Sequence, residues 1–133
     1  MADSLIIDTD ILIDAGRGIP DATGCLSEIR RRTSPATSVI TYMELMVGCR
    51  DKRELSELDR FISRFQVIRL NSRMSDIGAD LLHSYRLSHG LLIPDALIAA
   101  TAIFLGCPFV SKNQRDYIFI GELNLLPYPN PFS

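Results

Sequence analysis

The sequence predicts an α/β protein in which a central parallel sheet of four or five strands lies between two layers of helices. Three observations favour this fold class: short apolar runs recur along the chain, segments with helical periodicity separate them, and Gly or Pro residues stand at the boundaries. A length of 133 residues suits one domain with its own core. We therefore predict a single domain over residues 1–133, in which residues 127–133, with three prolines, form a C-terminal tail.

The first half of the chain is expected to contain two strands and three helices. Ile11, Leu12 and Ala15 share one face of a short helix that follows the first strand. This helix ends at Gly16, and Pro20 can open the next one because proline lacks an N–H that a first helical turn leaves unpaired. The expected order is a strand at residues 5–8, two helices, a strand at residues 36–40 and a helix at residues 41–47.

The second half is expected to contain three helices and up to three strands. Leu55, Leu58 and Phe61 recur at helical spacing, which indicates an amphipathic helix. Ser72 is expected to cap the clearest helix of the chain, whose apolar stripe extends to Tyr85. The expected order is a helix at residues 52–65, a strand at 66–70, a helix from 72 to 89, an Ala-rich helix at 95–105, a strand at 108–111 and a weaker strand near 123–126.

Four acidic residues each follow closely on a short apolar run: Asp8, Glu44, Asp95 and Asp116. The carboxyl ends of parallel strands meet at one edge of a sheet, and ligands bind there. Burying carboxylates together without a partner is costly, so acids that gather at such an edge require a cation between them. Carboxylate oxygens favour a hard ion such as Mg²⁺ or Mn²⁺. The sequence therefore predicts a metal site at this edge.

Each acid also has a purely structural interpretation. Asp8 or Thr9 could simply cap the helix that follows the first strand. Thr41 and Glu44 have the spacing of a capping box, in which the glutamate bonds only to the backbone. The other two acids lie in the first turn of a helix, behind Pro94, and in a polar loop. Only the combination of the four supports a metal site.

The composition permits a polyanionic substrate and excludes several kinds of chemistry. The net charge is −2, but without the four candidate ligands 12 acids remain against 14 Lys and Arg. Lys112 and Arg115 lie just before the fourth acid in the sequence and are candidates for contacting a phosphate. The three cysteines are widely spaced and only two histidines are present, which argues against a zinc site, a disulfide framework and a protein nucleophile paired with a base.

The chain is expected to act in the cytoplasm. Its apolar fraction of 47% and charged fraction of 23% are ordinary for a globular protein. The longest apolar stretch, residues 96–105, is too short to span a bilayer, and residues 5–7 are too few for a signal-peptide core. We therefore expect no membrane association.

Four segments taken together resemble those of one family. IIDTDILID, TYMELMVG, IPDALIAATA and SKNQRDY are similar to the motifs of the PIN domain, and specifically of the small VapC-like toxin ribonucleases of type II toxin–antitoxin systems. The resemblance extends from about Leu5 to Tyr117, and IPDALIAATA is its most specific part. It implies a PIN-like three-layer α/β/α fold and a Mg²⁺- or Mn²⁺-dependent endoribonuclease that hydrolyses a phosphodiester with an activated water.

The resemblance also implies roles for individual residues. Asp8, Glu44 and Asp95 correspond to the three principal metal-site acids, and Asp116 to the fourth. The supporting residues are Thr9, Asp10, Ser111 and Asn113. Ser111 and Asn113 would orient the first Asp and its bound water, with Ser111 standing where the family usually has Thr. Asp10 stands where Asn is common. It is either a further metal ligand or a hydrogen-bond acceptor that supports the ligands without binding the metal. Tyr117 replaces Phe and keeps the ring.

The partners that the resemblance implies are an RNA substrate, a second copy of the chain in a homodimer, and an antitoxin that reaches into the acidic pocket, often with an Arg. The apolar face of Leu55, Leu58 and Phe61 is a candidate surface for such contacts, and ordinary core packing is the other interpretation.

Three other functions stay open at this point. Asp8-Thr9-Asp10 also resembles the opening motif of the haloacid-dehalogenase phosphatases, although the later Gly-Asp element of those enzymes is missing from the sequence. A non-toxin PIN-domain nuclease in RNA processing is a second possibility. The third is a non-catalytic RNA- or protein-binding module whose acids are only helix caps, for which divalent cations should not raise the melting temperature.

Overall fold

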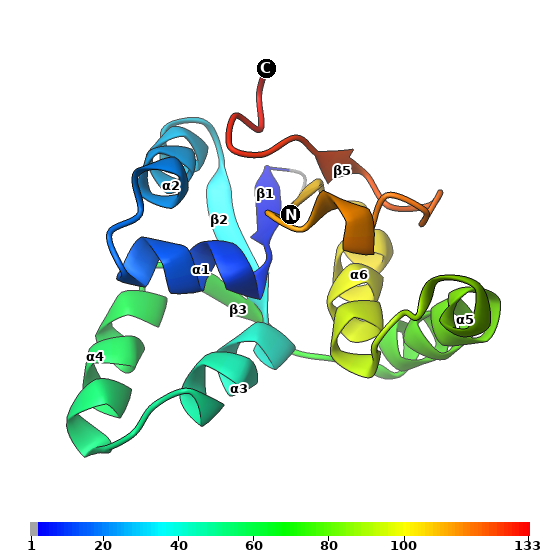
Figure 1. Ribbon diagram of the computed structural model, residues 1–133, viewed down its shortest axis with the longest axis horizontal. Helices are drawn as coiled ribbons and strands as arrows, with labels where there is room; N and C mark the ends of the chain where they lie inside the picture. The colour runs from blue at the N-terminus through cyan, green and yellow to red at the C-terminus, as the bar shows by residue number, and fades with distance from the viewer. Residues whose placement is uncertain (1–2) are drawn as a thin grey trace.

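A computed structural model describes residues 3–133, and these form a parallel sheet covered by helices on both faces (Figure 1). The sheet has five strands in the order β3-β2-β1-β4-β5, and every neighbouring pair is parallel. In chain order the elements are β1 (Ser4–Ile7), α1 (Thr9–Gly16), α2 (Pro20–Arg32), β2 (Ser34–Ser38), α3 (Val39–Val47), α4 (Lys52–Ile62), β3 (Gln66–Ile68), α5 (Ser72–His89), α6 (Ile93–Leu105), β4 (Phe109–Val110), the 3-10 helix η1 (Gln114–Asp116) and β5 (Leu125–Leu126). This confirms the predicted α/β class and parallel sheet, and of the four or five strands that were predicted the sheet has five.

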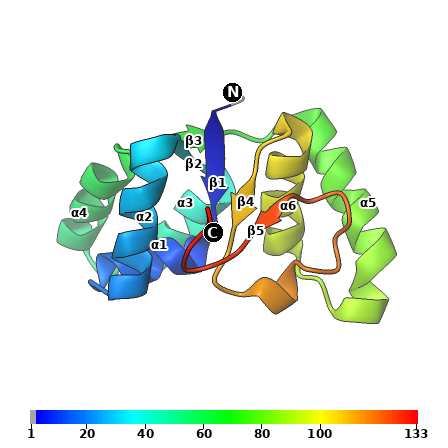
Figure 2. The same ribbon diagram turned by 90° about the horizontal axis from the view of Figure 1, so that it is seen from above.

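The sheet divides the hydrophobic core into two halves. Side chains alternate between the faces of a strand, so Leu5 and Ile7 of β1 join one apolar cluster and Ile6 joins the other. The cluster around Leu5 and Ile7 includes side chains of α1 and α2, whereas the cluster around Ile6 includes those of α5 and α6. Figure 2 shows the two helical layers on opposite sides of the central strand β1. Because both faces are covered, β1 and its neighbour β4 are fully buried, and all of their residues except Ser4 are apolar.

Two strands end beside β1, which lies at the centre of the sheet. β1 pairs with β2 on one side and with β4 on the other. Since all three strands run in the same direction, Asp8 after β1, Ser38 at the end of β2 and Ser111 after β4 lie along one edge. This is the edge at which the sequence predicts a site.

Helix α3 begins earlier than predicted. The sequence was expected to form a strand at residues 36–40 and a helix from Thr41, but β2 ends at Ser38 and α3 starts at Val39. The Ser38 hydroxyl accepts a hydrogen bond from the Ile40 N–H and thereby caps the helix. Val39 and Ile40 are β-branched and therefore resemble strand residues in sequence, although they occupy the first turn of a helix.

Other boundaries differ by one to three residues. The cap of α5 is Asn71 and not Ser72, because the Asn71 side chain accepts a hydrogen bond from the Met74 N–H at 2.9 Å. Helix α4 ends at Ile62 and not at residue 65. Helix α6 starts at Ile93, since a proline at position 94 fits the first turn.

The C-terminal residues are packed and do not form a free tail, which corrects the expectation for residues 127–133. Tyr128 and Phe132 pack against the apolar cluster of α1 and α2. The guanidinium of Arg32 lies 4.9 Å from the centre of the Phe132 ring, within the range of a cation–π contact. This segment therefore covers part of the core next to α2.

Helices α5 and α6 approach closely at Gly78. A Cβ atom added at this position would lie 2.9 Å from Leu97 Cδ2, so the contact depends on the missing side chain. This packing fixes α6, and with it Asp95 in the first turn of that helix.

Within residues 3–133, the three cysteines are free thiols, two of them buried. None of the helices in this part of the chain is both long and apolar enough to cross a membrane.

Candidate active site

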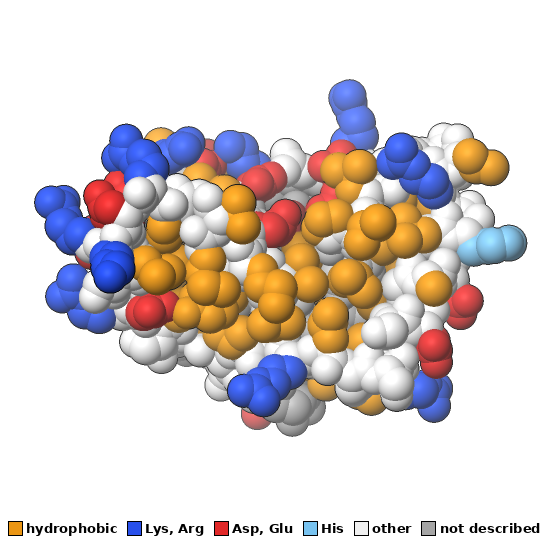
Figure 3. Space-filling model, turned by 90° about the horizontal axis from the view of Figure 1, so that it is seen from below, with side chains coloured by type: hydrophobic (Ala, Val, Ile, Leu, Met, Phe, Trp, Pro, Cys, Tyr) orange, Lys and Arg blue, Asp and Glu red, His pale blue; other side chains and the backbone are white. Residues whose placement is uncertain are grey.

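The four predicted acids come from four different segments that meet near the end of β1. Asp8 directly follows β1, and its side chain bonds to Thr9 N at the start of α1. Glu44 belongs to α3, Asp95 lies in the first turn of α6, and Asp116 is the last residue of η1. Figure 3 shows carboxylates gathered in a hollow at the border of an apolar surface.

Asp8 is buried, with 4% of its surface exposed, and it is held by three hydrogen bonds. Its Oδ1 accepts from Thr9 N at 2.9 Å and from the Tyr117 hydroxyl at 3.2 Å, and its Oδ2 accepts from the Ser111 hydroxyl at 2.7 Å. Burial raises the pKa of Asp8 from its ordinary value of 3.8 to about 7. The bonds from Ser111 and Thr9 lower this pKa, whereas the nearby Asp10 and Asp95 raise it further. Without a cation, ionised Asp8 is therefore unfavourable.

Asp95 experiences the same effects in weaker form. Its pKa is raised to about 6 by the sum of these effects: burial contributes most, the hydrogen bond from Tyr117 lowers the pKa, and Asp116, Glu44 and Asp10 raise it by repulsion. The pKa of Asp10 is also raised, first by burial. These interactions place five carboxylates in one electrostatic cluster, which includes every acid that the sequence predicted for the site.

The Tyr117 hydroxyl joins two of the acids. It lies 3.2 Å from Oδ1 of Asp8 and 3.2 Å from Oδ1 of Asp95, and the side chain is buried. A single hydroxyl proton cannot form full hydrogen bonds to two carboxylates at once. The negative charges of Asp8 and Asp95 are therefore only partly compensated. Sequence reasoning recognised only the ring of Tyr117. The sequence does show the hydroxyl, because Tyr117 stands where the PIN-domain motif usually has Phe. It does not show which groups the hydroxyl contacts, because these are brought together only by the tertiary fold.

Glu44 does not act as part of a capping box. Its Oε1 accepts a hydrogen bond from the Thr9 hydroxyl at 2.6 Å, and the hydroxyls of Thr9 and Thr41 lie 2.9 Å apart. Helix α3 is capped by Ser38, three residues before Thr41. Thr9, at the start of α1, thus links the first and second acids across the end of the sheet.

Ser111 and Asn113 contact different aspartates. Ser111 donates to Asp8 and accepts from the backbone N–H of Asn113 at 3.0 Å. The side-chain amide of Asn113 donates to Asp10 rather than to Asp8. Asp10 therefore lies beside the predicted ligands, with one oxygen bonded to Asn113.

The two candidate phosphate-binding cations differ in their surroundings. Lys112 forms an ion pair with Asp14 at 2.9 Å, and this contact raises the pKa of its ammonium group. The pair directs Lys112 toward α1. Arg115 lies on the exposed surface of η1, next to Asp116.

The residues fit a hard divalent cation by their chemistry. Within residues 3–133, no three Asp, Glu, His or Cys side chains are close enough together to enclose an ion as they stand, so the carboxylates must rotate toward each other to share one. The donors are oxygen atoms only, their negative charges repel one another, and burial disfavours the ionised form of Asp8 and Asp95. A bound Mg²⁺ or Mn²⁺, which prefers oxygen ligands, would relieve both the repulsion and the cost of burial.

Comparison of the sequence with known proteins gives consistent results. Residues 5–119 match the family described as PIN domain. The chain is 35% identical to Ribonuclease VapC19 of Mycobacterium tuberculosis over 120 residues, which cover 89% of this chain and 95% of that protein. It is 33% identical to Ribonuclease VapC10 of the same organism over 99 residues, which cover 74% of each.

The fold is similar to that of solved toxin–antitoxin proteins. A chain of a toxin–antitoxin complex from Klebsiella pneumoniae superposes with a TM-score of 0.77 at 28% identity, covering 94% of this chain and 97% of that one. A chain of VapBC2 from Rickettsia felis, bound to a DNA fragment from its promoter, superposes with a TM-score of 0.77 at 27% identity, covering 92% and 96%.

Proposed function

The chain belongs to the PIN domain family, and on that premise we propose that it is a metal-dependent endoribonuclease that acts in the cytoplasm as the toxin of a toxin–antitoxin pair. The names of its relatives support ribonuclease activity, and the solved complexes support an antitoxin partner. The observation that carries the proposal is the position of Asp8 and Asp95 on the two sides of one hydroxyl, with both carboxyl pKa values raised.

We assign the metal site to the four predicted acids, with Asp8 and Asp95 as its centre. One or two divalent ions bound there would lower the pKa of an attacking water and stabilise the charge that develops on the phosphate. No protein nucleophile is needed.

The remaining residues hold these acids in place. The N–H of Thr9 and the hydroxyl of Ser111 fix the two oxygens of Asp8, and the hydroxyl of Thr9 turns Glu44 toward the same edge. The guanidinium of Arg115 is the better placed of the two cations to meet an RNA phosphate, because Lys112 is paired with Asp14.

Removal of divalent cations is expected to abolish RNA cleavage. Purified protein treated with a chelator and then dialysed should cut a single-stranded RNA at the background rate, and Mg²⁺ or Mn²⁺ should restore cleavage, because the acids alone cannot activate water. The measurement is the initial rate on an end-labelled RNA. Full activity in the chelated protein, with contaminating nucleases excluded, would refute the metal-dependent mechanism.

We propose that the homodimer forms through the apolar surface in Figure 3. Met43 and Val47 of α3 are 50% and 86% exposed, and Leu92 and Ile93 at the start of α6 are 54% and 64% exposed. Four large apolar side chains at this exposure are unfavourable in water, and a second copy of the same surface would cover them.

We place the antitoxin in a second hollow, of about 350 Å³, between α1, α3 and α4. Its apolar wall contains Leu12, Ile13, Leu45, Leu58 and Phe61. Leu58 and Phe61 belong to the face of α4 that the sequence suggested for partner contacts, whereas Leu55, the third residue of that face, does not line the hollow. An apolar helical segment fits such a groove.

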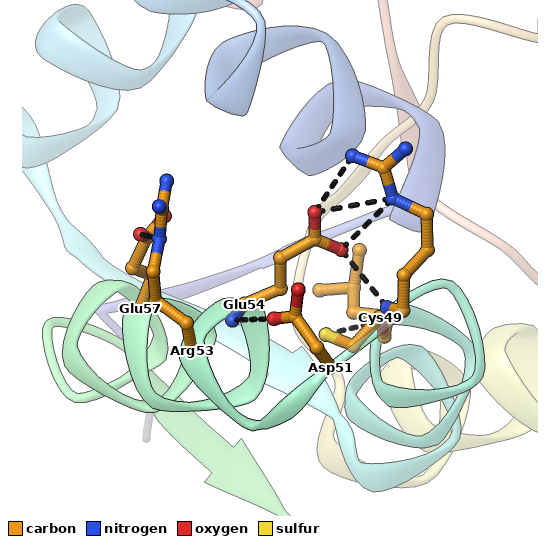
Figure 4. Close-up of polar contacts among 7 residues, drawn as sticks. Cys49, Asp51, Arg53, Glu54 and Glu57 are labelled. Atoms are coloured by element: carbon orange, nitrogen blue, oxygen red, sulfur yellow. Dashed lines mark hydrogen bonds and ion pairs between the residues drawn. The ribbon is translucent and has the colours of Figure 1, made fainter.

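Carboxylates line the rim of this groove. Glu54 is held by Arg50, whose guanidinium lies 2.8 Å away, and Glu57 by Arg53 at 3.1 Å (Figure 4). The Asp51 side chain caps α4 by accepting from Glu54 N. Exposed ion pairs of this kind contribute about 0–1 kcal/mol, so basic side chains of an antitoxin can replace the arginines.

Substitutions in the two surfaces should have reciprocal effects. Val47→Glu is expected to yield monomers that still bind antitoxin, because it puts a charge in the α3 surface only. Leu58→Lys is expected to stay dimeric and to bind antitoxin at least about tenfold more weakly, a loss of about 1.4 kcal/mol. Light scattering gives the mass and titration calorimetry gives the affinity. A dimeric Val47→Glu, or a Leu58→Lys with unchanged affinity, would contradict the corresponding assignment.

A further inference from the structure

Three rings form a compact cluster at the end of α5. The His89 imidazole stacks on the Phe119 ring, with centroids 4.1 Å apart and planes 11° apart. Tyr85, one turn earlier on α5, is tilted steeply against both, with centroids 6.0 Å from His89 and 5.2 Å from Phe119. The Ser88 hydroxyl lies 2.8 Å from His89 Nδ1 and so restrains the ring further. The imidazole is therefore held in a defined plane although the residue is exposed.

This ring cluster shares a hollow with the candidate active site. A cavity of about 150 Å³ is lined by His89 and Phe119, by Gly90, Leu91 and Leu92 of the following turn, and by the acids Asp95 and Asp116. Ligand pockets for whole drug-sized molecules measure about 300–1,000 Å³, so this hollow has room for only one group of a larger molecule. A group that enters it therefore shares the cavity with two ring-bearing residues and two proposed metal ligands.

We propose that His89 and Phe119 form a stacking platform for the nucleotide next to the cleaved phosphate of the RNA, which rests on the ribonuclease function proposed above. Bases that are splayed out of single-stranded RNA stack on the rings of Phe, Tyr, Trp and His. Each unit of a nucleotide chain carries a flat base and a phosphate, which matches a cavity that is lined both by ring side chains and by proposed metal ligands.

The platform positions the substrate and does not take part in the cleavage of the phosphodiester bond. His89 lines the same cavity as Asp95 and Asp116 but is not one of the proposed metal ligands, and its Nδ1 lies 2.8 Å from the Ser88 hydroxyl. Its effect should therefore fall on RNA affinity and on the choice of the cleaved position. It should leave the chemical step largely unchanged.

The test compares His89→Ala with His89→Phe in the full-length, metal-loaded protein acting on a short single-stranded RNA. Loss of one base stack is expected to raise KM about 5- to 100-fold in His89→Ala, with kcat within about threefold of the wild type. His89→Phe keeps a flat ring and should return KM to within about threefold. Leu87→Ala is the control, because Leu87 is fully exposed on the same helix end and should behave as the wild type.

A second readout separates positioning from a merely structural role. Sequencing of the RNA ends should show a changed distribution of cleaved positions in His89→Ala, while the melting temperature stays near that of the wild type. An unchanged KM and an unchanged distribution in His89→Ala would overturn the platform and leave the ribonuclease function intact. A wild-type protein that cuts no RNA with any divalent cation would overturn both.

Discussion

Asp8→Asn is expected to reduce RNA cleavage by about 10³-fold or more and, at the same time, to raise the melting temperature of the metal-free protein at pH 8. Asn is nearly isosteric with Asp, but it lacks the negative charge that would bind the cation, so transition-state stabilisation is lost. The neutral amide also removes the cost of burying a carboxylate. A shift from 3.8 to about 7 in the pKa of Asp8 corresponds to a cost of at most ~4 kcal/mol.

The opposite directions of these two effects make the prediction specific. Initial cleavage rates and thermal melts of the metal-free proteins should be measured side by side, with Asp80→Asn as a control because Asp80 is an exposed acid on α5. The control should match the wild type in both assays. An Asp8→Asn protein that is inactive and also less stable would contradict this prediction. It would mean that Asp8 stabilises the fold through its hydrogen bonds and does not bind a metal ion.

The second large effect is a loss of folding stability of the metal-free protein as the pH rises, which divalent cations should oppose. Below pH 3.8 Asp8 is protonated in both states and has no effect on the free energy of unfolding. Between pH 3.8 and about 7 the unfolded chain releases the proton and the folded protein keeps it, so the metal-free protein loses stability as the pH rises. Asp95, with a pKa raised to about 6, acts in the same direction.

Mn²⁺ should offset much of this loss of stability. A ligand that binds only the folded state at 100 times its Kd stabilises by about 2.7 kcal/mol, which is about 10 °C in melting temperature for a chain of this size. The increase should be larger at pH 8 than at pH 5, because protons compete for the carboxylates at the lower pH. Melts at several pH values, with and without Mn²⁺, measure this directly. Equal melting temperatures with and without Mn²⁺ at pH 8 would favour acids that are only helix caps.

The fold was largely predictable because its signals are local. The apolar runs of a parallel sheet buried on both faces, such as residues 5–7, are visible in the sequence, and so are the Gly and Pro residues that separate them. The start of α3 was missed because Val39 and Ile40 have strand-like side chains, and the cap at Ser38 depends on where β2 leaves its neighbour. The packed C-terminus was missed because three prolines give no sign that Tyr128 and Phe132 reach the core.

The candidate site was predictable only in part. The positions of the acids after apolar runs could be read from the sequence, since strand ends of a parallel sheet share an edge. The contacts that hold the site together could not, because they join residues far apart in the chain. Thr9 to Glu44, Asn113 to Asp10, and Tyr117 to both Asp8 and Asp95 are such contacts. The pairing of Lys112, a predicted phosphate contact, with Asp14 is another.

The shared cation is tested most directly by anomalous X-ray diffraction from crystals of the wild-type protein soaked in Mn²⁺. We expect one or two strong Mn²⁺ peaks between the carboxylates of Asp8 and Asp95, with the side chains turned toward the ion, and no peak there in Asp8→Asn crystals. Crystals of active protein that are saturated with Mn²⁺ and yet show no peak among these carboxylates would contradict the proposal.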